Sequence, residues 1–132
     1  MKSYFLFYFL SIYNPIIAQK HILSVQISGF DSDRGKAMVM LLNDQEQEVH
    51  SAILPITDKK ASISFKDLSS GKYAVKAFHD ANGNGKLDTN LWGFPKEKWG
   101  VSNGISATLG PPDFKKMLFE VKQDRQIIIK LG

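Results

Sequence analysis

Oxygen-bearing side chains recur at regular spacing in a nine-residue segment, 80–88, which reads D-A-N-G-N-G-K-L-D. They belong to Asp80, Asn82, Asn84 and Asp88. This spacing matches positions 1, 3, 5 and 9 of a calcium-binding loop, with a glycine at position 6 and the carbonyl of Lys86 at position 7. Calcium takes about six to eight oxygen ligands, and a chain that coils round the ion presents alternate side chains to it. The segment therefore predicts a calcium site.

The ligand set is incomplete within the segment itself. Position 12 of an EF-hand loop is a bidentate Glu, and here it is Leu91. Glu97 is the nearby acidic side chain that could complete the shell, and backbone carbonyls or water are the alternatives. With so few carboxylates, we expect a structural ion with a dissociation constant on the order of 10⁻⁵–10⁻³ M. The competing interpretation is a plain Asn-Gly turn, because such pairs form turns without any metal.

Three aromatic residues, Trp92, Phe94 and Trp99, follow this segment closely. Exposed rings could stack on sugars or dock a peptide, so Trp92 and Trp99 are candidate ligand-binding residues. Alternatively, the rings form a small satellite core that holds a long loop against the domain. The second interpretation is favoured, because apolar contact is the usual way in which a long loop is held.

The sequence contains no arrangement typical of a catalytic site. His79 precedes Asp80, which invites an acid–base role, but the other two histidines lie in separate segments. A carboxylate pair drawn from Asp80, Asp88 and Glu97 would suit a hydrolase or a carbohydrate-active enzyme. The chain has no G-x-S-x-G, phosphate-binding or dinucleotide-binding motif. We therefore expect a binding or structural module rather than an enzyme.

The elements that must position the 80–88 segment are strands, because apolar and polar residues alternate with period two along most of the chain. Strands are expected at 21–28, 36–42, 49–55, 61–66, 72–78, 114–121 and 126–131. The second of these is apolar on both faces, which is typical of a central strand. Between 79 and 113 no strand or helix is expected, so this stretch is predicted to be one long loop. About seven strands predict an all-β fold, a single antiparallel β-sandwich that occupies residues 19–132.

Residues 1–18 have the character of a secretory signal peptide. Lys2 gives a positive start, residues 4–12 are almost unbroken apolar sequence, and Ala18 is a small residue suited to cleavage. The apolar run is shorter than the roughly 20 residues that span a bilayer, so no transmembrane segment is expected in the mature chain. We expect an exported protein of the periplasm, cell surface or extracellular space, where calcium is available.

Composition narrows the classes of partner and chemistry. The 132 residues are 43% apolar, which is enough for one core, and the formal net charge of +4 is scattered. Without a basic run, nucleic-acid binding is not expected. The absence of cysteine excludes disulfides, thiol catalysis and Cys-type zinc sites. The partner is left open, with a cell-envelope protein or a glycan as candidates.

Three stretches of the chain resemble the bacterial domain of unknown function DUF2141. They are F-K-D-L-S-S-G-K-Y-A-V-K-A-F-H-D-A-N-G-N-G-K-L-D-T-N (65–90), G-F-P-K-E-K-W-G-V-S-N (93–103) and P-P-D-F (111–114). The resemblance covers most of the chain after residue 19. It implies an exported domain, and the family has no assigned activity.

Two shorter motifs add expectations about fold and metal. The F-x-D-L-x-x-G-x-Y run is similar to that of prealbumin-like and carboxypeptidase-regulatory-like sandwiches, and the general shape is also Ig-like. In those folds the aromatic residue and the Tyr, here Phe65 and Tyr73, anchor neighbouring strands across a glycine turn. The D-x-N-x-N-G-x-x-D run is similar to loops in calcium-stabilised B-type repeats of bacterial surface proteins. This second resemblance implies calcium at 80–88, although Leu91 departs from the EF-hand pattern.

Overall fold

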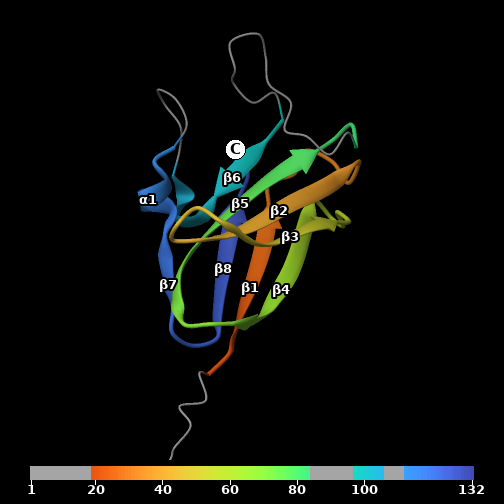
Figure 1. Ribbon diagram of the computed structural model, residues 1–132. Coiled ribbons are helices and arrows are strands. Elements are labelled where there is room, and N and C mark those ends of the chain that lie inside the picture. The colour runs from red at the N-terminus through yellow and green to blue at the C-terminus, as the bar shows by residue number, and fades with distance from the viewer. Residues whose placement is uncertain (1–18, 84–96, 106–111) are drawn as a thin grey trace, which may run out of the picture.

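The computed structural model describes residues 19–83, 97–105 and 112–132, which form two β-sheets packed face to face (Figure 1). Eight strands lie within these ranges, one more than the sequence predicts. The expected all-β sandwich is confirmed. None of the helices in these ranges has the length and apolar character needed to span a bilayer. The predicted signal peptide, 1–18, lies outside the described residues.

The first sheet has three strands in the order β4-β1-β8. They are β1 (His21–Ser28), β4 (Lys60–Leu68) and β8 (Arg125–Lys130). Leu23, Val25 and Ile27 of β1 are buried, as the period-two pattern predicts, and the residues between them face outward. β1 pairs antiparallel with β4 but parallel with β8, so the sandwich is not purely antiparallel.

The second sheet is built around a long strand, β5 (Gly71–Asp80), in the order β3-β2-β5-β6. The other members are β2 (Lys36–Asn43), β3 (Glu48–Leu54), β6 (Trp99–Val101) and β7 (Phe119–Val121). β2 has a hydrogen-bonded neighbour on each side, which confirms the prediction that it is central. β6 and β7 share the far side of β5, where they pair with different parts of it.

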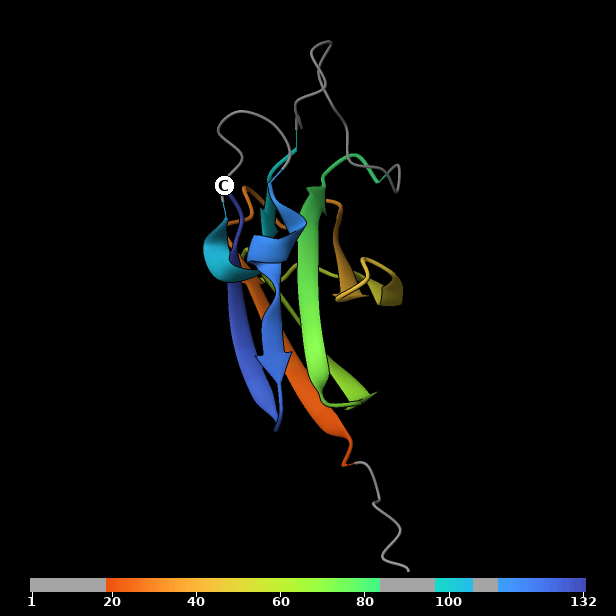
Figure 2. The same cartoon turned by 60° about the vertical axis from the view of Figure 1, so that its left-hand side comes forward.

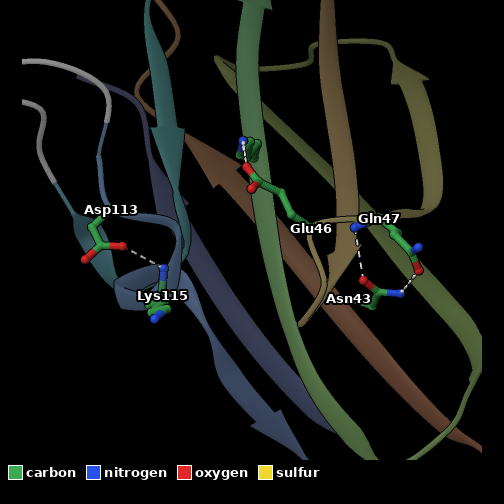
Figure 3. Close-up of polar contacts among 6 residues, drawn as sticks. Asn43, Glu46, Gln47, Asp113 and Lys115 are labelled. Atoms are coloured by element: carbon green, nitrogen blue, oxygen red, sulfur yellow. Dashed lines mark hydrogen bonds and ion pairs between the residues drawn. The ribbon is translucent and has the colours of Figure 1, made fainter.

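Local polar contacts close the turn between β2 and β3. The Oδ1 atom of Asn43 accepts the backbone N–H of Gln45 at 2.9 Å. It also accepts the backbone N–H of Gln47 at 3.0 Å, and the Asn43 Nδ2 donates to the Gln47 side chain at 3.0 Å (Figure 3). An Asn side chain that bonds to the backbone two residues later is a common way to reverse the chain. The turn brings Glu46 within 3.6 Å of the Lys76 ammonium on β5.

The main core lies between the sheets and takes its apolar side chains from both. Phe65 and Tyr73 belong to it, at 4% and 8% exposure, and the Tyr73 hydroxyl donates to the Ser69 carbonyl at 2.7 Å. The Tyr therefore ties the start of β5 to the turn that precedes it. This is the anchoring across the glycine turn that the F-x-D-L-x-x-G-x-Y motif implies.

Two sequence-based assignments are wrong in part. The 79–113 stretch is not wholly without secondary structure, because β6 and a 3₁₀ turn, η1 (Ser102–Gly104), lie in it. The strand expected at 114–121 begins instead as a short helix, α1 (Phe114–Met117), and only its second half forms β7. Asp113 starts the helix, since its Oδ1 accepts the Lys115 N–H at 3.1 Å (Figure 3).

A second group of apolar side chains, called the satellite cluster here, packs on the outer face of the second sheet. Its buried members are Leu42, Ala74, Val101 and Met117, and its partly buried members are Trp99, Ile105, Phe114 and Leu118. These residues come from β2, β5 and β6 on one side, and from α1 and the residues directly after η1 and α1 on the other. Figure 2 shows α1 and η1 lying against one edge of the sandwich. The cluster therefore fixes the segment that follows β6.

Ser102 fills a gap in the hydrogen bonding of β5. β6 pairs with Lys76–Phe78 and β7 with Gly71–Tyr73, so neither reaches Val75. The Ser102 hydroxyl, in a residue that is 2% exposed, accepts the Val75 N–H at 3.0 Å and donates to the Met117 carbonyl at 2.6 Å. One buried hydroxyl thus satisfies two backbone groups that would otherwise be unpaired.

Replacement of Ser102 by alanine should therefore destabilise the fold. Ser102→Ala leaves a buried N–H and a buried C=O without this partner, and such a loss costs about 1–3 kcal/mol of unfolding free energy. Urea denaturation followed by circular dichroism measures the change. Ser51→Ala on the exposed face of β3 is the matched control, with an expected change within about 0.5 kcal/mol. Equal stability of the two variants would contradict the bridging role.

Candidate functional site

The residues predicted to form the calcium site are divided between described and undescribed parts of the chain. Asp80, Asn82 and Glu97 are described. Asn84, Lys86 and Asp88, together with the ligand-binding candidate Trp92, lie outside the described residues. The described members stand at the two ends of the 84–96 segment, so the geometry of these two ends is what the structure provides.

Asp80 ends β5 and is 2% exposed, which is unusual for a carboxylate. Its Cα atom is paired with that of Lys36, the first residue of β2, so the ladder extends to the last residue of the strand. Beyond it the chain turns sharply: Gly83 has a φ of 70°, and its N–H lies 3.4 Å from the Asp80 carbonyl. A glycine adopts this left-handed conformation without the steric cost that other residues bear. The first predicted ligand is therefore held by a regular strand and followed at once by a turn.

Glu97, which directly follows the 84–96 segment in the sequence, contacts this turn. Its Oε2 atom accepts the backbone N–H of Ala81 at 2.8 Å, across 16 positions of sequence. The return is fixed by backbone pairing, because the His79 N–H donates to the Lys98 carbonyl at 2.9 Å and Trp99 pairs with Phe78. The carboxylate proposed to complete the shell thus contacts the residue directly after Asp80.

A turn formed by residues 29–35, called the framing turn here, contacts both ends of the segment. On the entering side, the His79 ring bonds through Nε2 to the Arg34 carbonyl at 2.6 Å, so that nitrogen carries the proton. The same ring meets Phe30 edge to face, with centroids 5.1 Å apart. On the returning side, the Lys98 ammonium lies 2.8 Å from an Asp31 carboxylate oxygen and 3.3 Å from the Gly29 carbonyl. The hydrogen bond from Lys98, with its positive charge, lowers the pKa of the Asp31 carboxyl.

Sequence reasoning missed the framing turn as part of the site. It identified 29–35 only as a turn rich in Gly and Asp, and nothing local links that turn to residues 45 positions later. The signal in the sequence was a glycine at each end of this turn, Gly29 and Gly35. In the structure both glycines have positive φ values, 87° and 72°. Paired glycines of this kind often mark a close approach of two backbones.

The described residues include only some of the side chains that the sequence predicts as calcium ligands. Among them, no group of three or more His, Cys, Asp and Glu side chains is placed to hold a metal ion. Asp80 and Glu97 bring carboxylates, which are hard oxygen donors suited to calcium, to opposite ends of one segment. The remaining predicted oxygen donors belong to the undescribed stretch. Carboxylate and amide oxygens of this kind are donors that calcium prefers over transition metals, so the prediction of calcium stays a prediction.

Trp99 and His79, the residues considered for ligand binding and for acid–base chemistry, are both in packed surroundings. Trp99 is half-buried and lies against the satellite cluster, which favours its interpretation as an anchor. His79 is 3% exposed, between Phe30 and the Arg34 carbonyl. Both side chains are thus packed against the sandwich rather than free to meet a ligand.

Comparison with known proteins gives a family for the chain. No curated protein matches it, and no solved structure does. A family model described as "Uncharacterized protein conserved in bacteria (DUF2141)" matches residues 25–129, which span both sheets and both ends of the candidate site. The chain therefore belongs to the DUF2141 family of uncharacterized bacterial proteins.

Proposed function

We propose that this protein is an exported, non-enzymatic β-sandwich module in which a calcium ion stabilises the 80–88 segment. The hydrogen bond between Glu97 and the Ala81 N–H supports the proposal most directly. It brings a carboxylate from beyond the segment to the residue next to the first ligand position. The spacing of Asp80, Asn82, Asn84 and Asp88 then supplies further oxygen donors at intervals that suit calcium.

The ion has a structural role in this proposal. Ordering a long connection costs about 1–2 kcal/mol of conformational entropy per residue, which local polar sequence cannot offset by burial. A ligand that binds only the folded state at 100 times its dissociation constant adds about 2.7 kcal/mol of stability. That gain is substantial against the roughly 5–15 kcal/mol by which domains are stable. Buried Asp80 at the end of β5 would transmit the gain to the sheet.

Export and partner class follow from the sequence. The apolar leader at 1–18 supports passage out of the cytoplasm. A compartment with millimolar calcium then fills a site whose dissociation constant is on the order of 10⁻⁵–10⁻³ M. The partner of the module would be a cell-envelope protein or a glycan.

The absence of a catalytic role rests on the sequence, which has no nucleophile motif beside the carboxylates. The alternative hydrolase would use a pair drawn from Asp80, Asp88 and Glu97, separated by about 5–10 Å with no ion between them. A glycan- or peptide-binding module using Trp92 and Trp99 is the other alternative. The packing of Trp99 on the satellite cluster favours the calcium-stabilised module over this alternative.

Calcium should raise the thermal stability of the purified protein. In differential scanning calorimetry, excess calcium over a chelator baseline should add about 2.7 kcal/mol at 100 times the dissociation constant. Asp80→Ala and Asp88→Ala should abolish the calcium-dependent part. Asp44→Ala, an exposed Asp in the β2–β3 turn, should retain it. If the melting midpoint of the wild-type protein does not respond to calcium, the 80–88 segment is an Asn-Gly turn without a metal ion.

Substitutions at Glu97 distinguish two roles of this side chain: a charged calcium ligand, and an acceptor of the Ala81 N–H. Glu97→Gln keeps an oxygen that can accept the Ala81 N–H but removes the negative charge, so stability in chelator should change little. Calcium affinity, measured by titration calorimetry, should fall about tenfold, which corresponds to roughly 1.4 kcal/mol. If Glu97 is only a structural acceptor, the Gln variant will bind calcium like the wild type. Glu97→Ala should lower both calcium affinity and stability in chelator.

A further inference from the structure

The outward face of the first sheet carries polar side chains in three rows, called the serine face here. β4, β1 and β8 lie side by side (Figure 1), and residues paired across neighbouring strands face the same side of a sheet. The rows, each in the order β4, β1, β8, are Ser64, Ser24 and Gln126; Ser62, Gln26 and Ile128; and Lys60, Ser28 and Lys130. All of these positions are described, and none of them carries an acidic side chain.

A hollow of about 710 Å³ opens on the serine face. Its lining includes Ser24 and Ser64, whose hydroxyl oxygens lie 3.3 Å apart, and the amide side chains of Gln26 and Gln126. Ligand-binding pockets typically have volumes of about 300–1,000 Å³. The hollow is therefore large enough for a small ligand or for part of a longer chain.

One wall of the hollow is the link between β3 and β4, which is held in a fixed conformation. Asp58 and Lys59 have φ values of 53° and 60°, in the left-handed region that residues other than glycine adopt only at a cost. The Asp33 carboxylate supports them, since it accepts the Asp58 N–H at 3.1 Å and the Lys59 N–H at 2.7 Å. On either side of this turn, Thr57 and Lys60 line the hollow and exchange backbone hydrogen bonds of 2.9 and 3.0 Å. The wall is therefore part of the fold itself.

The chemistry of the serine face is that of uncharged donors and acceptors beside two positive charges. A serine hydroxyl and a glutamine amide each donate and accept hydrogen bonds. Lys60 lines the hollow and shares a row with Lys130, and the ion pairs within the described ranges are made by other lysines. Asp58 and Asp67 lie outside the three rows. The surface thus complements a ligand that has many hydroxyl groups and a negative charge.

We propose that the serine face binds an acidic polysaccharide. In this proposal the hollow accepts sugar hydroxyls, while Lys60 and Lys130 pair with carboxylate groups of the sugar chain. The inference deepens the proposed function, in which a glycan is a candidate partner, and it rests on that partner class but requires no metal ion.

Other large partners suit this surface less well. Ile128, at 67% exposure, is the single exposed apolar side chain in the three rows. A membrane surface requires a broader apolar face, and the centre of a protein interface is usually apolar as well. A single-stranded nucleic acid stacks its bases on aromatic rings, and these rows contain none.

Titration with a hexamer of galacturonic acid, followed by amide NMR, tests the proposal. The titration is run in chelator, so that calcium neither bridges the sugar chains nor binds the protein. It should extend to about 10 mM, because exposed charges without an aromatic platform bind weakly. The amide resonances of Ser24, Gln26 and Ser64 should shift together, while that of Trp99 on the other sheet stays in place. Maltohexaose, an uncharged chain of the same length, should bind much more weakly.

Substitutions on the serine face should weaken binding of the hexamer. Lys60→Gln and Lys130→Gln should each raise its dissociation constant about two- to fivefold, as expected for the loss of an exposed ion pair. Ser64→Glu places a carboxylate in the hollow and should raise the dissociation constant about tenfold. These side chains are exposed, so melting midpoints should change little.

Matched controls make the same changes of charge on the second sheet. Lys36→Gln at the start of β2 and Ser51→Glu on β3 alter exposed residues far from the hollow in the fold. Both control variants should bind the hexamer like the wild type. Equal weakening by the controls would show attraction to net charge alone and would overturn the site.

The remaining outcomes separate this inference from the proposed function. Shifts at Trp99 without shifts at Ser24 and Ser64 would overturn the serine face and favour the alternative module that uses tryptophan. Binding to phosphatidylglycerol vesicles but not to the hexamer would replace the polysaccharide by a membrane surface. No binding of the hexamer would overturn the inference and leave calcium stabilisation, which this titration does not measure, as it stands.

Discussion

The hydrogen-bond ladder along β5 is the constraint on which the second sheet and the candidate site both depend. On one side all eight residues of β2 pair with β5, and on the other side β6 and β7 divide the strand between them. The Ser102 hydroxyl occupies the gap between these two short strands. Because β5 runs without interruption to Asp80, the first predicted ligand sits at the end of a rigid element.

The same ladder explains how the far end of the candidate site is positioned. β6 pairs with Lys76–Phe78 of β5. The chain therefore runs alongside His79 immediately before it enters β6. That return places Glu97 against Ala81. The framing turn then packs on both passes of the chain, with Gly35 permitting the close approach. Sites built at the ends of strands gain precision from such a scaffold, since the supporting shell fixes the ligands.

Local patterns predicted the long strands well, because alternation within β1 and β5 depends only on which face is buried. They failed where pairing is decided by distant segments. β6 has only three residues, too few for a visible period, and α1 has a sequence that also suits a strand. The parallel pairing of β1 with β8 joins the two ends of the domain and leaves no local signal.

The candidate site, like the fold, could be predicted from the sequence only in part. The ligand spacing of 80–88 is a local pattern and is readable from the sequence, as is the acidic character of Glu97. The contact of Glu97 with Ala81 requires the β5–β6 pairing, so its partner could not be predicted. The role of the framing turn requires the approach of two backbones 45 residues apart, which appears in the sequence only as a pair of glycines.

Site-resolved calcium titration by amide NMR tests the central claim most directly. If calcium binds at the 80–88 segment, the amide resonances of Ala81, Gly83 and Lys98 will shift together and saturate with one dissociation constant on the order of 10⁻⁵–10⁻³ M. Amides of the β7–β8 turn, at 122–124, which lies at the opposite end of β5 from Asp80, will stay in place and serve as the internal reference. Unmoved resonances at Ala81, Gly83 and Lys98 up to about 10 mM calcium would contradict the account.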